Sequence, residues 1–114
     1  MTEIHGIARL KIHDGKLTEL KRLQAKCLEI VRTKDTGTLH YALYFNSDET
    51  ECIVHEHYRD SEALLEHFAN LGDTMQAILD TCTISGEILG APSPALRKAL
   101  EGTVVKIFTP HQVM

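Results

Sequence analysis

The chain has 114 residues and a net charge of -4, with 43% hydrophobic residues, values typical of a single soluble domain over residues 1–114. It has no basic run and no tryptophan, and only 5% of its residues are aromatic, so a nucleic-acid partner is not expected. No apolar stretch approaches the roughly 18 residues of a membrane-spanning helix, so a membrane partner is not expected either.

The cysteines and the first residues bear on localisation. The chain has an odd number of cysteines, which are widely spaced and form no C-x-x-C motif: Cys27, Cys52 and Cys82. This pattern is typical of reduced, buried thiols. No activating partner is tied to them in the sequence, so a cysteine nucleophile is not expected. Residues 1–10 lack the charged head and long apolar core of a signal peptide. We therefore expect a cytoplasmic protein.

The first elements are predicted by their hydrophobic periodicity. Alternating apolar residues predict a strand over residues 4–13, which ends at Asp14-Gly15. Apolar residues at helical spacing predict an amphipathic helix over residues 16–32, followed by a stop at residues 35–37.

A β-hairpin is predicted next. Residues 38–45 are rich in β-forming side chains, residues 46–49 form a polar turn, and alternation resumes from Glu51 to about Arg59. Pairing Phe45 with Cys52 keeps the apolar faces of both strands together. The same register places Tyr41 opposite Glu56 and His40 opposite His57.

The second helix follows the hairpin directly. Asp60 or Ser61 supplies an N-cap, and apolar residues at helical spacing continue to about residue 80, with a possible break at Gly72. A fourth strand, interrupted by Gly86, is predicted over residues 83–90. A short helix over residues 94–100 then begins at the cap Ser93, and a fifth strand covers residues 104–108.

This order of elements predicts an α+β fold. It is the ferredoxin-like split β-α-β plan (β-α-β-β-α-β) with an extra C-terminal helix and strand. One sheet face would carry apolar residues such as Ile7 and Ile53 among His5, Arg9 and His55, too apolar for open solvent and too polar for a core. We therefore expect a homodimer, a dimeric α+β barrel, with residues 104–108 reaching across to the partner's sheet.

Glu56 and His67 are the candidate catalytic residues. Each occupies a position where strand alternation or helical spacing would place an apolar side chain. Because the strand runs straight into the helix, their two faces pack together, and the carboxylate and imidazole are expected to share one cavity. Such a pair can exchange protons with a bound small molecule. The alternative is that they hydrogen-bond each other or the backbone and only satisfy a buried polar spot.

Neighbouring residues would shape this cavity. Phe68 and Met75 are expected to contact the substrate, together with Leu43 and Val54 in the walls. Tyr41 and Tyr58 flank Glu56 and would orient a planar, aromatic ligand, although ordinary core packing explains them too. For the remaining histidines no metal is expected, because no carboxylate or cysteine is tied to them by a recognised ligand spacing. The histidines in question are His5, His13, His40, His55 and His57.

Several segments resemble the antibiotic biosynthesis monooxygenase family of small dimeric α+β-barrel proteins. They are G-K-L-T-E-L at residues 15–20, T-G-T-L-H-Y-A-L-Y at 36–44, V-H-E-H-Y-R-D-S-E-A-L-L-E-H-F at 54–68 and G-A-P-S-P-A-L-R-K-A-L at 90–100. The resemblance implies one of several activities: oxygenation of polyphenols or quinols without a cofactor, haem degradation, or isomerisation of small signalling molecules.

The resemblance also bears on cofactors. Haem-degrading members use an Asn, a Trp and an iron-binding His, at positions that here hold Ala8, His67 and about Ala77. We therefore expect no haem and no other cofactor. The leading hypothesis is a small-molecule enzyme that resembles the cofactor-independent monooxygenases of quinol-like or polyphenol-like aromatic substrates. The alternative is a non-catalytic dimer of the same fold that binds a small molecule or serves in a stress response.

Overall fold

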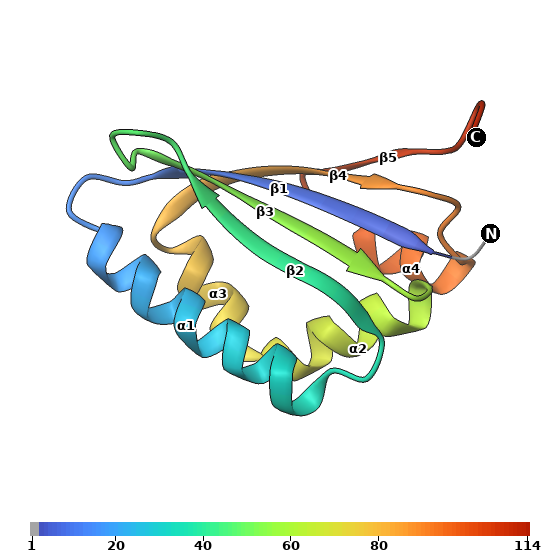
Figure 1. Cartoon of the computed structure of the whole chain (residues 1–114), viewed down its shortest axis with the longest axis horizontal. Coiled ribbons are helices and arrows are strands. Elements are labelled where there is room, and N and C mark those ends of the chain that lie inside the picture. The colour runs from blue at the N-terminus through green and yellow to red at the C-terminus, as the bar shows by residue number, and fades with distance from the viewer. Residues whose placement is uncertain (1–2) are drawn as a thin grey trace.

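The computed structural model describes residues 3–114 and contains one five-stranded sheet (Figure 1). The strand order is β2-β3-β1-β4-β5, and all pairs are antiparallel except β4 with β5. The strands are β1 (Ile4–Ile12), β2 (Thr38–Phe45), β3 (Glu51–Tyr58), β4 (Cys82–Leu89) and β5 (Val105–Phe108). The predicted α+β plan is confirmed.

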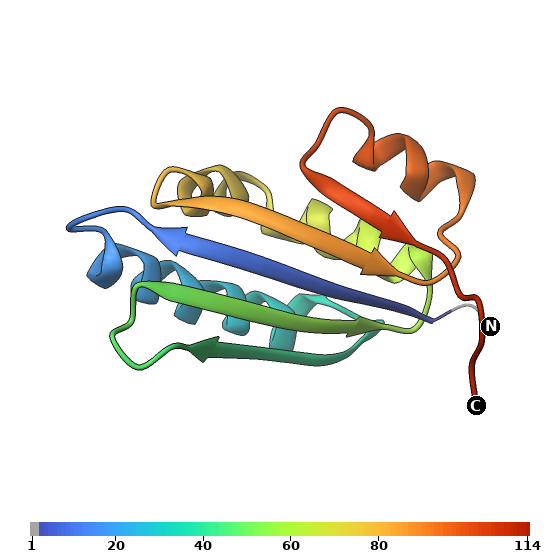
Figure 2. The same cartoon turned by 90° about the horizontal axis from the view of Figure 1, so that it is seen from above.

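All helices lie on one side of the sheet, and its other face is open (Figures 1 and 2). They are α1 (Leu17–Lys34), α2 (Ser61–Leu71), α3 (Asp73–Leu79) and the short α4 (Pro94–Leu100), which lies next to β5. In the part of the chain that the structure describes, no helix is both long and apolar enough to cross a membrane. The two faces of the sheet therefore meet very different surroundings.

The helix ends follow the capping chemistry of the sequence. The Asp60 side chain accepts a hydrogen bond of 2.9 Å from the Ala63 amide, which identifies Asp60 as the N-cap of α2. Gly72 separates α2 from α3 with a positive φ of 51°, a conformation that suits glycine. The Ser93 hydroxyl accepts from the Leu96 amide at 3.2 Å, so α4 begins as predicted.

The predicted hairpin register is confirmed. Tyr41 lies opposite Glu56, Leu43 opposite Val54, and His40 opposite His57. Since successive side chains alternate between faces, this register puts Tyr41 and Glu56 under the helices and the two histidines on the open face.

One prediction for the C-terminal strands is wrong. Gly86 does not interrupt β4, because the missing side chain allows a close approach: a Cβ there would lie 3.0 Å from the carbonyl oxygen of Ile7. The fifth strand joins its own sheet, where β5 pairs in parallel with β4; that it also reaches a partner's sheet stays a prediction. β5 extends its own sheet because residues 90–104, which include α4, form a crossover long enough for parallel pairing.

The core divides into two clusters under the sheet. One contains Ile4, Tyr58 and Leu64 and is closed by Leu96 of α4. The other is built around Leu10 and includes Leu20, Cys52, Val54 and Cys82. The cavity described next is bordered by members of both clusters.

Candidate active site

A cavity of about 560 Å³ lies between the covered face of the sheet and helices α1, α2 and α3. The apolar wall residues expected from the sequence all line it, namely Leu43, Val54, Phe68 and Met75. Gly102 and Val104, in the segment between α4 and β5, line it too and are exposed, so its opening lies beside this segment. The size suits a small organic molecule.

His67 of α2 reaches this cavity from a fully enclosed position. Its side chain is 2% exposed, and its Nδ1 atom lies 2.7 Å from Oδ2 of Asp35, which itself is 1% exposed. The Asp35 carboxylate also accepts hydrogen bonds from the Asn70 amide at 2.8 Å and the Thr38 hydroxyl at 2.7 Å. The Asp35 carboxylate thus accepts from two side chains of α2, His67 and Asn70, and from Thr38 of β2.

These hydrogen bonds decide the charge of Asp35. Burial acts to raise the pKa of Asp35, but the bonds from Asn70, Thr38 and His67 outweigh it, and the pKa lies below its usual value. Asp35 is therefore an anion that only accepts hydrogen bonds, so Nδ1 of His67 must carry a proton. Among residues 3–114 no side chain or backbone group bonds to Nε2, which leaves that nitrogen for a ligand.

Glu56 of β3 borders the same cavity, and its pKa is shifted in the direction opposite to that of Asp35. Burial raises the pKa of Glu56, and this outweighs the opposing effects of a hydrogen bond from the Tyr58 hydroxyl and the nearby His67 ring. Part of the Glu56 surface is accessible from the cavity, yet the carboxyl is enclosed by protein. A carboxyl that holds its proton in an apolar cavity can act as a proton donor.

Two tyrosine rings flank His67, each with its centroid 5.5 Å from that of the imidazole. Tyr41 lines the cavity, and burial and the charge of Glu56 raise its pKa, so its phenol is neutral at physiological pH. In the described part of the chain the Tyr41 hydroxyl makes no hydrogen bond and is available to a ligand. Tyr58 is fully buried and lies behind Glu56 instead of lining the cavity.

The structure thus places five of the six candidate residues around one cavity: Tyr41, Glu56, His67, Phe68 and Met75. Glu56 and His67 each have a partner of their own, Tyr58 and Asp35, so the alternative that they bond each other does not describe the site. Sequence reasoning missed Asp35, which was interpreted only as part of a helix stop, and Thr38. One signal was present: Asn70 lies three residues after His67 and therefore on the same helix face.

The fold and this cavity define a small α+β protein with a carboxylate–imidazole pair and a second carboxyl group at a cavity under its sheet. Comparison with known proteins identifies its family. The family model described as antibiotic biosynthesis monooxygenase matches residues 4–79, two thirds of the chain. The chain belongs to this family.

Solved structures with the same fold extend this result. MupZ from Pseudomonas fluorescens matches with a TM-score of 0.87 and 22% identity over 100% of this chain and 94% of that chain. Rv0793 from Mycobacterium tuberculosis matches with a TM-score of 0.70 and 23% identity, over 82% of this chain and 99% of that chain. SnoaB from Streptomyces nogalater, a cofactor-independent oxygenase, matches with a TM-score of 0.69 and 17% identity, over 82% of this chain and 96% of that chain. At these identities the likeness shows the fold alone. The search of curated proteins gave no match.

Proposed function

We propose that the chain is a small-molecule enzyme that deprotonates a phenolic or quinol-like aromatic substrate and oxygenates it without a cofactor. One observation carries the proposal: a charged Asp35 holds His67 at the wall of an apolar cavity that also contains the Glu56 carboxyl, whose pKa is raised. An imidazole oriented by a charged carboxylate, beside a carboxyl group whose pKa is raised, is typical of proton-transfer sites.

In the first step Nε2 of His67 takes the phenolic proton. Asp35 favours this transfer because its negative charge stabilises the imidazolium that forms and fixes the ring orientation. The apolar walls exclude water from the resulting phenolate, and Tyr41 is placed to donate a hydrogen bond to its oxygen. The phenolate is electron-rich enough to reduce molecular oxygen.

The remaining steps balance with oxygen as the only co-substrate. A ring carbon bonds to one oxygen atom, and Glu56 gives its proton to the other oxygen to form a hydroperoxide. Glu56 then takes the proton from that ring carbon while the O–O bond breaks, which leaves a carbonyl and releases hydroxide. His67 returns its proton to the hydroxide. The phenol plus oxygen becomes a quinone and water, and both residues regain their starting protonation states.

Oxygen uptake with a panel of hydroquinones and polyphenols tests this function, with heat-denatured protein as the control for autoxidation. We expect uptake by the wild type, a loss of about 10² to 10⁴-fold in His67→Ala and in Glu56→Gln, and no change in His111→Ala on the exposed tail. With ¹⁸O₂ the product should contain one labelled oxygen atom. Tight binding of these phenols without oxygen uptake would overturn the oxygenase and support the non-catalytic alternative.

The same substrates distinguish the proposed oxygenase from an enzyme that only transfers protons. Incubation in deuterated buffer under nitrogen shows whether the protein exchanges a substrate proton. Exchange without any oxygen uptake in air would assign an isomerase-type reaction to Glu56 and His67 and contradict the oxygenation step.

We further propose a homodimer formed through the open face of the sheet. That face exposes large apolar side chains, with Tyr44 55% exposed, Ile53 37% and Phe108 52%. A second copy that covers this face removes them from water. Sedimentation at neutral pH should give a dimer for the wild type and a monomer for Ile53→Asp. A monomeric wild type would contradict the proposal.

A further inference from the structure

The open face of the sheet carries a row of imidazoles that the proposed reaction does not use. His5 of β1 lies directly opposite His57 of β3, with the rings stacked 3.9 Å apart at 10°. His55 lies two positions before His57 on β3. Its ring centroid is 5.2 Å from that of His40 on β2. These side chains lie on the face opposite the cavity.

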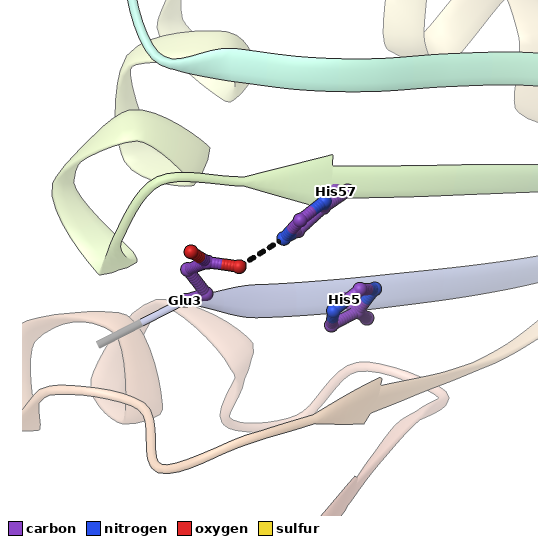
Figure 3. A group of neighbouring side chains, drawn as sticks. All are labelled: Glu3, His5 and His57. Atoms are coloured by element: carbon purple, nitrogen blue, oxygen red, sulfur yellow. Dashed lines mark hydrogen bonds and ion pairs between the residues drawn. The ribbon is translucent and has the colours of Figure 1, made fainter. Parts of the chain in front are cut away.

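Glu3 brings a carboxylate to the end of this row (Figure 3). Its Oε1 atom lies 2.6 Å from Nε2 of His57, although 54 residues separate them in the sequence. The ligand atoms that Glu3, His5 and His57 offer all lie within 4.8 Å of one another. Glu3 lies two positions before His5, just ahead of β1, and its side chain points toward His57 (Figure 3).

We propose that Glu3, His5 and His57 form a binding site for a divalent transition-metal ion of the zinc type. Two imidazoles and one carboxylate with an open position are a donor set found in zinc and iron sites. Imidazole nitrogen favours zinc, nickel or copper over magnesium and calcium, which prefer oxygen ligands.

Metal binding requires the two rings to turn out of their stack, because an imidazole nitrogen binds a metal ion in the plane of its ring and the planes of His5 and His57 are nearly parallel. Two ligands about 2.1 Å from a tetrahedral ion lie roughly 3.4 Å apart, so donors now up to 4.8 Å apart must approach by at most about 1.4 Å. In the single chain, side-chain rotation supplies this movement, because Glu3 and His57 have side chains that are 48% and 23% exposed. A second copy on the open face would cover part of this group, so the zinc titration is repeated with Ile53→Asp, which is designed to be monomeric.

The ion pair between Glu3 and His57 does not account for the whole group. It uses one imidazole, and among the described residues no hydrogen bond is made to the ring nitrogens of His5, which only stacks on its neighbours. A metal ion between the carboxylate and both rings would engage all three. The ion would also bring a positive charge that attracts the negative charge of Glu3. Protonating both stacked rings instead would place two positive charges side by side.

Calorimetric titration with zinc chloride tests the site, using untagged full-length protein first dialysed against a chelator. We expect one zinc ion per chain in the wild type, and affinity at least about ten-fold weaker in His5→Ala, His57→Ala and Glu3→Gln. His111→Ala removes an exposed imidazole outside the group and should bind zinc like the wild type. Circular dichroism checks that each variant is folded.

A second measurement needs no variant. Added zinc should shift the imidazole resonances of His5 and His57 in NMR spectra of the wild type and leave that of His111 in place. The proposal is overturned if zinc does not bind saturably, if folded His5→Ala and His57→Ala bind it as tightly as the wild type, or if the resonances of other histidines shift instead.

Discussion

Each face of the sheet holds one carboxylate–imidazole pair, and the two pairs have nearly the same geometry. Under the helices, Nδ1 of His67 lies 2.7 Å from Asp35; on the open face, Nε2 of His57 lies 2.6 Å from Glu3. Their exposure differs greatly. The side chains of His67 and Asp35 are 2% and 1% exposed, against 23% and 48% for His57 and Glu3.

The difference shows that burial and further partners decide what such a pair can do. Asn70 and Thr38 also bond to Asp35, so this carboxylate stays charged and fixes the orientation of the His67 ring, as proton transfer requires. Solvent screens the open pair, and its carboxylate can move. The pair on the open face therefore suits a reversible ligand such as a metal ion.

The largest expected effect is on stability and separates the two pairs directly. Asp35→Ala leaves three donors without their acceptor in a closed site, so we expect the free energy of unfolding to fall by about 3–5 kcal/mol. Glu3→Ala removes the same kind of partner from the open face and should cost less than about 1 kcal/mol. Urea unfolding followed by circular dichroism measures both. Equal losses would show that burial does not distinguish the pairs.

A smaller effect is expected from the hydroxyl behind Glu56. Tyr58→Phe removes the donor to the Glu56 carboxyl, which should cost about 1–3 kcal/mol and raise the pKa of Glu56 further. If Glu56 acts as the acid, the fall of activity at high pH moves to higher pH. Tyr44→Phe is the matched control, because Tyr44 is 55% exposed on the open face. The same pH profile in Tyr58→Phe and wild type would contradict this role.

The raised pKa of Glu56 also predicts how stability depends on pH. Below the unfolded-state pKa of about 4.5 the carboxyl is protonated in both states. As the pH rises above it, the unfolded chain releases the proton while the folded chain keeps it, so wild-type stability falls relative to Glu56→Gln. The loss is about 1.4 kcal/mol per pH unit until the folded pKa is reached.

Unfolding of both proteins between pH 4.5 and 8 measures this difference. Asp35 does not interfere, because its pKa is lowered: its contribution is complete above its usual value of 3.8 and is lost only as the pH falls further. A difference between wild type and Glu56→Gln that stays constant over this range would show that burial does not hold the Glu56 proton.

Most of the fold could be predicted because its signals are local. Alternation fixed the faces of the strands, helical spacing fixed α1 and α2, and Asp60, Gly72 and Ser93 marked helix ends by their own hydrogen bonds or backbone angles. The error at Gly86 and the unpredicted parallel pairing of β5 with β4 both concern contacts between distant segments. Neither contact has a periodicity that the sequence displays.

The candidate site was predictable for the same reason and only to the same extent. Periodicity placed Tyr41 and Glu56 on the covered face of the sheet and His67 on the helix face that packs against it. The structure brings all three to one cavity. Asp35 is 32 residues from His67 and lies after the end of α1, where no repeat constrains its side chain. Its role became visible only when β2 and α2 enclosed it.

The smallest expected effect on stability concerns the opening of the cavity. Val104 is 56% exposed and lines the cavity from the segment before β5, beyond the residues 4–79 that the family model matches. Val104→Trp should narrow the opening and change the free energy of unfolding by less than about 0.5 kcal/mol. If the proposed polyphenol substrates enter past this side chain, their KM should rise about ten-fold, equivalent to roughly 1.4 kcal/mol, while that of hydroquinone stays unchanged. Val113→Trp, 72% exposed on the C-terminal tail and outside the cavity lining, is the matched control for an added indole. Equal KM changes for large and small substrates, or the same changes in Val113→Trp, would show that this segment does not select substrates by size.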